Sequence, residues 1–452
     1  MDRAVAQPRN QALLVGLGAV FASVGAVPLL LLLGTTTYNV WGGVLIAPLL
    51  VAVSAPALRR QAEREDDPRL FAILVGALSL KLAGAVARYF VAYSVYGGVA
   101  DASGYDEWGR RLATTFWRGD LHTGLPSLSS TNFIRFFTGI VYSTIGPTKL
   151  GGFLVFSWLG FWGLFLFYRA FSIAAPEGRN RAYAALVFFL PSLVFWPSSI
   201  GKEAWMMFSL GIAALGVAKL LAGRMLGGLI PLGLGLWFAA IVRPHVAGMV
   251  AVALVAGYLL KRPHPGLRQL APIGKTVVLA ALVVIAGILV VQTDQFLHGF
   301  GRGPNPGVSD ILQGVTERTQ QGGSSFAPSV LESPLRTPVA AVTVVFRPLL
   351  VDATNVQSLI AATEGTILLL FSLVRIRWIL AALFSIRRQP YVGFAIAYAG
   401  VFIVGFSAIA NFGLLARERV QLLPLYLVLL CIPPADVRER EAREREEVVT
   451  VP

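Results

Sequence analysis

Residues 150–168 read LGGFLVFSWLGFWGLFLFY, a stretch of 19 residues without a charged side chain. An α-helix rises about 1.5 Å per residue, so about 20 apolar residues cross the hydrocarbon core of a bilayer. Similar runs recur along the 452-residue chain, which is 56% hydrophobic and only 14% charged, with a mean hydropathy of +0.68. So little charge cannot cover a soluble surface of this size. The sequence therefore predicts an all-α, polytopic integral membrane protein, and it excludes soluble enzymes, peripheral proteins and single-span receptors.

The apolar runs predict about twelve transmembrane helices within one domain, residues 1–433. External loops are expected at about 97–149 and 292–337, with helices lying at the membrane interface, and residues 434–452 form a charged tail. The expected spans are residues 12–33, 40–58, 70–96, 150–168, 183–198, 204–221, 225–241, 246–260, 276–291, 356–373, 391–410 and 420–432.

The charge of the chain fixes the expected orientation. Its formal net charge is +14, but most Lys and Arg residues lie in short segments between apolar runs, such as residues 59–69. This distribution follows the positive-inside rule, so we expect a multi-pass cell-membrane protein with cytoplasmic N- and C-termini and no nucleic-acid partner. The single cysteine, Cys431, excludes an intramolecular disulfide and a thiolate metal site.

Polar side chains are costly at membrane depth, and in this topology most of those near the spans gather at the external face. A protein that carries out chemistry at the outer leaflet would have this distribution. The residues concerned are Asp101, Asp106, Glu107, Lys202, Glu203, Arg243, His245, Arg347, Asn411, Arg417, Glu418 and Arg419.

The first external loop contains an acidic motif followed by a helical pattern. Residues 99–121 read VADASGYDEWGRRLATTFWRGDL, in which Tyr105, Trp108 and Leu112 have helical spacing. The pattern predicts an amphipathic helix that lies on the membrane surface, opened by Asp101 and the pair Asp106 and Glu107.

This loop resembles the first external loop of the GT-C integral membrane glycosyltransferases. The segments FWRGDL (116–121) and TNFIRFFTGIVYSTIGPTKLGG (131–152) are similar to the interfacial segment and next span of that family. The segment FLPSLVFWPSSIGKEAW (189–205) resembles a span that ends and restarts around a polar tip, as in GT-C and exopolysaccharide polymerase-like proteins.

The resemblance implies a sugar transferred from a polyprenyl-phosphate donor to a glycan or lipid acceptor, among membrane lipids. Such an enzyme must deprotonate an acceptor hydroxyl and stabilise the departing phosphate. Asp101, with Tyr105 beside it, is the expected base, and Asp106 and Glu107 are alternative bases or ligands of a divalent metal. No organic cofactor is expected. The cations expected to hold the phosphate are Lys202, Arg243, Arg347, Arg417 and Arg419.

Other polar residues allow a structural role beside a functional one. Lys81 and Arg88 share a helix face, and Lys81 either pairs with a buried acid such as Glu364 or lines a groove for a lipid phosphate. His245 lies at the outer surface and is a further candidate for the site. The ordinary alternatives are helix-start acids at Asp106 and Glu107, a snorkelling Lys202 beside a capping Glu203, and interfacial anchors at 417–419.

Two rival functions remain at this stage. A polysaccharide polymerase would use lipid-linked oligosaccharide at the same face, whereas a transporter or lipid flippase would use Lys81, Arg88 and Glu364 as a path. A transporter needs polar groups throughout the membrane depth, and this chain concentrates them at one face. The absence of a nucleotide-phosphate motif argues against a nucleotide-sugar donor.

Overall fold

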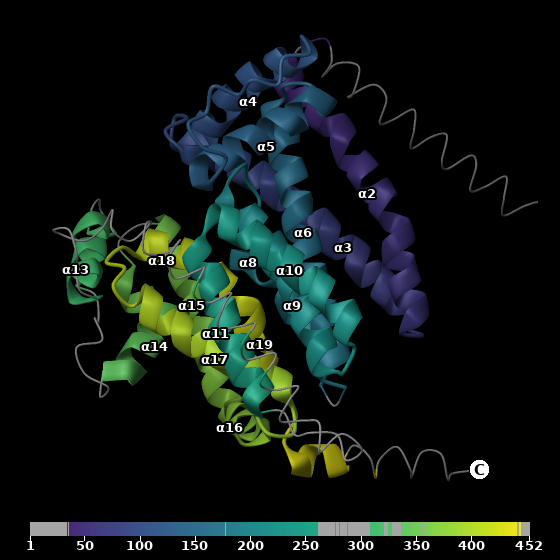
Figure 1. The fold of residues 1–452 in the computed structure, drawn as a ribbon, viewed down its shortest axis with the longest axis vertical. Coiled ribbons are helices and arrows are strands. Elements are labelled where there is room, and N and C mark those ends of the chain that lie inside the picture. The colour runs from purple at the N-terminus through teal and green to yellow at the C-terminus, as the bar shows by residue number, and fades with distance from the viewer. Residues whose placement is uncertain are drawn as a thin grey trace, which may run out of the picture.

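The structure is a computed structural model that describes residues 36–176, 178–260, 308–320, 324–327, 336–353 and 356–440, together with a few isolated positions. These ranges consist of helices joined by turns and loops, and within them the only β-pairing is an isolated bridge between Ser325 and Asn411 (Figure 1). The expected all-α class is confirmed.

Five of the described helices are long and apolar enough to cross a membrane, which indicates a membrane protein. A sixth candidate is the pair α15 (Val356–Val374) and α16 (Ile376–Ser385), which is bent by 67° at its junction. The five are α2 (Tyr38–Arg64), α3 (Pro68–Phe90) continued by the π-helical turn η1 (Val91–Val95), α6 (Lys149–Ala174), α9 (Lys202–Leu221) and α10 (Met225–Val242).

The expectation of twelve membrane-length helices is not confirmed. The run 183–198 is divided into α7 (Asn180–Phe189) and α8 (Pro191–Phe195), because Pro191 lacks an N–H and forces Leu190 into an extended conformation. The run 420–432 contains α19 (Leu423–Leu430), which at eight residues is too short to cross.

Two further helices have an intermediate length, and two expected spans cannot be compared. The helices α11 (Pro244–Leu260) and α17 (Pro390–Phe406) have 17 residues each. The runs 12–33 and 276–291 lie outside the described residues, apart from isolated positions.

The first expected loop is a helical hairpin. The amphipathic pattern forms α4 (Asp101–Trp117), which packs on α5 (Ser130–Ile145) through its buried Tyr105, Leu112 and Ala113. The two helices approach so closely that a Cβ at Gly109 would lie 2.5 Å from Thr138 Cγ2. The predicted surface helix is therefore confirmed as a helix, and its apolar face is covered by α5.

The second expected loop is described only in part. It includes α13 (Val308–Thr319) and residues 324–327, and it leads to α14 (Thr337–Phe346) and the short turn η4 (Leu350–Asp352). The chain then closes with α18 (Phe412–Glu418) and η5 (Arg419–Gln421) before α19.

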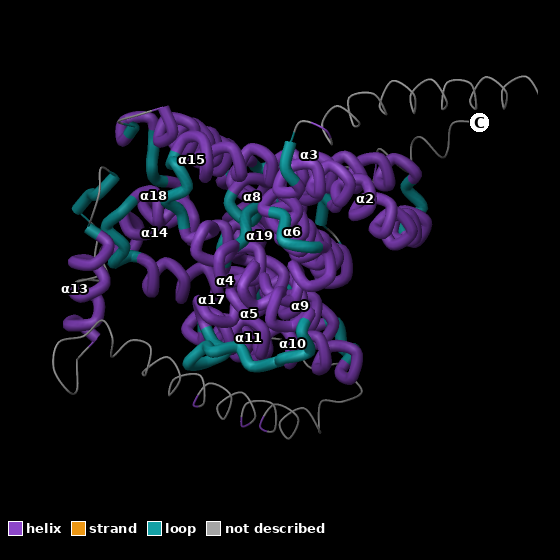
Figure 2. The backbone as a smooth tube through the Cα atoms, turned by 90° about the horizontal axis from the view of Figure 1, so that it is seen from above, coloured by secondary structure: helices purple, strands orange, loops and turns teal. Residues whose placement is uncertain are grey.

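The centre of the molecule is formed by α6 and α9. The most apolar 18-residue stretches of these two helices are 78% and 83% buried, respectively. Small residues allow these helices to touch, because a Cβ at Gly163 would lie 2.3 Å from the Met207 carbonyl oxygen. In the view from above, α13 lies at the margin of the molecule, away from α6 and α9 (Figure 2).

The bundle has two chemically different ends. The hairpin of α4 and α5 covers one end, where Asn39 accepts hydrogen bonds from Arg110 and from the backbone N–H of Lys149 (Figure 1). We call this the site end. At the opposite end, the arginine end, Arg181 pairs with Asp67 at 2.9 Å. The segments expected to be cytoplasmic place their cations at the arginine end, among them Arg64, Arg169, Arg179, Arg375 and Arg377.

Candidate functional site

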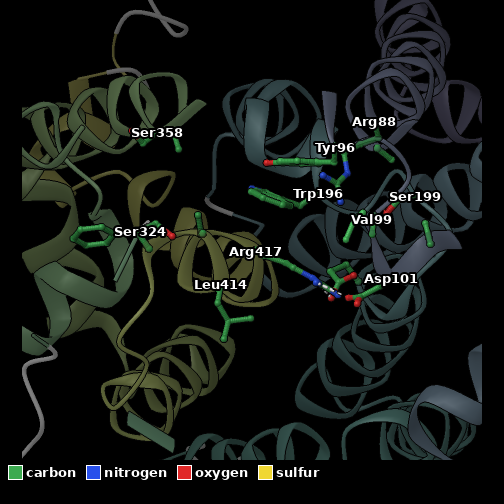
Figure 3. A pocket seen from close by; sticks show the side chains of 18 of the residues that line it. Arg88, Tyr96, Val99, Asp101, Trp196, Ser199, Ser324, Ser358, Leu414 and Arg417 are labelled. Atoms are coloured by element: carbon green, nitrogen blue, oxygen red, sulfur yellow. Dashed lines mark hydrogen bonds and ion pairs between the residues drawn. The ribbon is translucent and has the colours of Figure 1, made fainter. Parts of the chain in front are cut away.

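Two neighbouring cavities lie at the site end, and they share Asp101 and Arg417; Figure 3 shows the first of them. We call the first, of about 550 Å³, the apolar cavity; its walls include Ala92, Phe153, Trp196, Ile200, Phe412 and Leu414. We call the second, of about 660 Å³, the cationic cavity; its walls include Tyr105, Thr131, Arg135, Lys202, Arg243 and Glu418. Both volumes fall in the range of small-molecule sites, roughly 300–1,000 Å³.

Asp101 and Arg417 form the boundary between the two cavities. Asp101 is the first residue of α4, and its Oδ2 lies 2.9 Å from Arg417 Nη1, which comes from α18. The two side chains point toward each other in Figure 3. Asp101 remains 62% exposed, whereas Arg417 is largely buried, so the carboxylate is the accessible member of the pair. The structure therefore brings together two residues that are 316 positions apart in the sequence.

A second, buried carboxylate neutralises Arg417 at its Nε atom. Glu203, at the start of α9, lies 2.7 Å from Arg417 Nε and is almost completely buried. Its charge holds the pKa of Arg417 above the ordinary value, so this guanidinium stays protonated. Arg417 is thus anchored to Glu203 whether or not Asp101 is charged.

Glu203 continues into a buried network with Arg243 and Glu418. Arg243 Nη2 lies 3.0 Å from Glu203 Oε1 and 2.7 Å from Glu418 Oε1, and Gln421 donates to Glu418 at 2.6 Å. Burial raises the pKa of Glu418, which the two arginine charges oppose. Removing one member of such a network leaves an uncompensated buried charge, at a cost of about 3–5 kcal/mol. Arg243 therefore has a structural role in addition to lining the cationic cavity.

Arg88 occupies the apolar cavity without an acidic partner. Its guanidinium lies 4.8 Å from the Phe195 ring centre and 4.9 Å from that of Trp196, between helices α3 and α8. No carboxylate in the described ranges forms an ion pair with Arg88, and its buried Nε has no hydrogen-bond partner there. A cation held by aromatic rings but not neutralised can receive an anionic ligand.

The cationic cavity likewise contains two cations without an acidic partner in the described chain, Lys202 and Arg135. Lys202 Nζ contacts the Ser130 hydroxyl at 3.1 Å, and Arg135 Nη1 donates to Asn132 Oδ1 at 2.9 Å. Neither side chain forms an ion pair with a carboxylate of the described chain. Arg135 is absent from the sequence-based candidates, although a lone arginine in the apolar segment NFIRFF was a signal that could have found it.

Tyr105 lines the cationic cavity on the α4 side. Burial, and next the negative charge of Asp101, raise the pKa of this phenol to about 12. Tyr105 therefore keeps its proton at neutral pH and can act as a hydrogen-bond donor but not as a base.

The two acids that follow Tyr105 in the sequence, Asp106 and Glu107, lie away from both cavities. Asp106 is buried between α4 and α5, where it accepts hydrogen bonds from Tyr142 at 2.6 Å and from Arg110 at 3.0 Å. Glu107 is exposed and pairs with Arg111 one helical turn on. Neither acid lines either cavity, so their placement favours contacts of the helical hairpin over catalysis.

Lys81 and Glu364 do not form the ion pair that the sequence offered as one alternative. Both hold α8 instead: Lys81 Nζ donates to the carbonyl oxygens of Leu193 at 2.5 Å and Val194 at 3.2 Å, near the C-terminal end of that helix. Glu364 accepts from the backbone N–H of Ser192 at 2.6 Å, near its N-terminal end. The two side chains thus contact opposite ends of the short helix, and neither residue lines a cavity.

Three further candidates also lie away from the cavities. Arg347 pairs with Asp352 at 2.5 Å, Arg419 is fully buried and donates to the Arg347 carbonyl oxygen at 3.0 Å, and His245 is half-buried near Phe406. A sequence can place these residues near one membrane surface, but only packing decides whether they face a cavity.

No group in the described residues is suited to hold a metal ion, because no three His, Cys, Asp or Glu side chains come together there. Comparison with family models, with curated proteins and with solved structures finds no match for this chain. The function must therefore be inferred from the chemistry of the two cavities.

Proposed function

We propose that this protein is a GT-C-type glycosyltransferase that moves a sugar from a polyprenyl-phosphate donor to a glycan or lipid acceptor. The site end would face the exterior and the arginine end the cytoplasm, in keeping with the positive-inside rule. Of about twelve crossings, α11, α17 and the broken pair α7 and α8 would add three to the five membrane-length helices and the bent pair α15 and α16, and the runs 12–33 and 276–291 would add two more.

The observation that carries this proposal is an exposed carboxylate between two cavities. Asp101 is accessible from the apolar cavity on one side and from the cationic cavity on the other. A transferase needs a base at the point where donor and acceptor meet, and a general base typically contributes about 100-fold to 10,000-fold in rate.

The apolar cavity suits the donor. Its aromatic and aliphatic side chains lie at the ends of α3, α6 and α8, which suits a prenyl chain entering from the membrane. Arg88 supplies a guanidinium without an acidic partner for the phosphate. Arg88 lies next to η1, a π-helical turn of the kind that is frequent at functional sites.

The proposed step follows from this arrangement. Asp101 takes the proton of the acceptor hydroxyl while the acceptor oxygen forms a bond to the anomeric carbon. The bond from that carbon to the phosphate oxygen breaks, and the lipid phosphate leaves with the electron pair toward Arg88. Arg417 remains neutralised by Glu203 when Asp101 becomes protonated, so the network need not reorganise during the step.

The test is the lipid that accumulates when the base is lost. Cells whose only copy carries Asp101→Asn should accumulate the same lipid as cells without the protein, identified by mass spectrometry of extracted lipids. Asp120→Asn is the matched control, because Asp120 is an acid in the same segment that contacts only a local backbone N–H. Its lipid profile should equal that of the parent.

The identity of the lipid decides between related functions. A monosaccharide-phosphate lipid supports the proposed transfer, whereas an oligosaccharide-diphosphate lipid would favour a polymerase. If the Asp101→Asn cells show the parent profile, Asp101 is not the base and the proposal fails.

A further inference from the structure

The cationic cavity contains more positive charge than its carboxylates balance. Four cations line it, Arg135, Lys202, Arg243 and Arg417, against two acids, Asp101 and Glu418. The apolar cavity is lined by two cations and two acids, but both acids, Asp101 and Glu203, form ion pairs with Arg417, which leaves Arg88 as its one cation without an acidic partner in the described chain.

The excess is located at two specific residues. Arg243 and Arg417 are already neutralised by the buried carboxylates Glu203 and Glu418. Lys202 and Arg135 have only neutral partners in the described chain, the Ser130 hydroxyl and the Asn132 amide oxygen. Both side chains are half-buried, and even the partial desolvation of a cation without a counter-charge is costly, so helix packing alone does not explain this pair.

Both side chains have defined contacts within the protein and remain partly exposed. Lys202 is the first residue of α9, and Arg135 lies on α5, where its guanidinium is 5.1 Å from the Trp108 ring centre. An ammonium and a guanidinium that line the same cavity can together bind an oxyanion, such as a phosphate or carboxylate.

We infer that the cationic cavity binds an acidic group of the acceptor, so that the acceptor is an anionic glycan or lipid. This inference rests on the proposed function, because it places the acceptor on the side of Asp101 opposite to the donor. The acidic group would be held by Lys202 and Arg135 while the acceptor hydroxyl reaches Asp101, and Tyr105, which also lines this cavity, would be a further hydrogen-bond donor.

Binding of two probes to the full chain in lipid nanodiscs tests the inference. Inorganic pyrophosphate represents the acidic group alone, and farnesyl phosphate represents the lipid-phosphate donor. Lys202→Met should weaken pyrophosphate binding about 10- to 100-fold, as expected for the loss of a charge-assisted contact, and should leave farnesyl phosphate binding within about 2-fold. Arg135→Met should show the same pattern.

Matched variants control for net charge and folding. Lys219→Met removes the same charge from the far end of α9, and its pyrophosphate affinity should equal that of the parent. Arg88→Met should weaken farnesyl phosphate binding and leave pyrophosphate binding intact, whereas Arg69→Met, at the other end of α3, should change neither. An unchanged thermal unfolding midpoint shows that each variant is folded.

The outcomes separate the inference from the proposed function. If Lys202→Met and Arg135→Met bind pyrophosphate like the parent, the cationic cavity is not an anion site. If they instead lose farnesyl phosphate, the donor phosphate occupies this cavity and the assignment to the acceptor is wrong. If Lys202→Met and Arg135→Met behave as expected but Arg88→Met binds farnesyl phosphate like the parent, the donor site is misplaced. The anion site then still stands.

Discussion

Arg417 illustrates how much a single side chain depends on its geometry. Its Nη1 faces Asp101 and its Nε faces Glu203, so one planar guanidinium joins an accessible carboxylate to a buried one. An ammonium group is a point charge and cannot keep both contacts at these positions.

Arg417→Lys should therefore impair transfer more than its conserved charge suggests. We expect the rate to fall by at least about 10-fold, since one charge-assisted contact of about 1.5–3 kcal/mol is lost from the site. The measurement is the level of accumulated lipid in complemented cells. Full complementation by the lysine variant would show that Arg417 is only an interfacial anchor.

Arg347 provides the contrasting case of a cation with a structural partner. Its hydrogen bonds hold the pKa of Asp352 below the ordinary value of 3.8. The carboxylate then contributes stability above the unfolded-state pKa, and this contribution is lost as the pH falls through the depressed native value.

The Arg347→Gln variant should lose this pH dependence. We expect the parent's unfolding midpoint to fall more steeply between pH 5 and pH 3 than that of the variant, by a small amount because the pair is partly exposed. Farnesyl phosphate binding at pH 7 should stay within about 2-fold of the parent. A large loss of binding would place Arg347 in the donor site after all.

At the scale of the element, α8 is the decisive feature. This helix of five residues is too short to be stable alone, and it is held at its ends by Lys81 from α3 and Glu364 from α15. Phe195, the last residue of α8, and the following Trp196 have their ring centres 4.8 Å and 4.9 Å from the Arg88 guanidinium. The position of Arg88, the cation expected to bind the donor phosphate, thus depends on α8, which Lys81 and Glu364 hold in place.

Lys81→Met should loosen α8 without removing any group from the cavities. Deprived of the ammonium donor, the carbonyls of Leu193 and Val194 lose a buried partner, at a cost of about 1–3 kcal/mol. Hydrogen exchange of residues 191–196 should become about 5-fold to 100-fold faster, which corresponds to that cost. Lys219→Met is the control. Equal exchange rates in the two variants would show that Lys81 does not hold α8 in place.

At the scale of the whole molecule, the opposition of the two ends is the main result. The hairpin of α4 and α5 and both cavities lie at one end. The other end contains the ion pairs of Arg181 on α7 with Asp67 at the start of α3, and of Arg377 on α16 with Asp436. A membrane protein with this asymmetry is expected to place the arginine end in the cytoplasm.

Single cysteines test this orientation. In a Cys431→Ala background, Ser127→Cys at the site end should react with an impermeant thiol reagent added to intact cells. Ala222→Cys, an exposed position between α9 and α10, should react only after the membrane is permeabilised. The reverse pattern would place the cavities in the cytoplasm and exclude an external transferase.

The sequence by itself determined the class of the protein and the character of its segments. Apolar runs of about 20 residues have few alternatives to membrane-length helices, and the spacing of Tyr105 and Leu112 required an amphipathic helix, which α4 confirms. Composition could not fix the number of full-length spans, because Pro191 divides one run and the run 420–432 contains only eight helical residues after η5.

Only the tertiary structure decided which polar residues share a site. Asp101, Arg88, Lys202 and Arg417 line the cavities, whereas Asp106 lies within the helical hairpin, although it is only five positions from Asp101. Successive residues of a helix point about 100° apart, so sequence distance does not determine which side chains meet. The partners of buried charges come from distant helices, as Glu203 and Arg417 do, and their pairing is set by packing that local sequence does not encode.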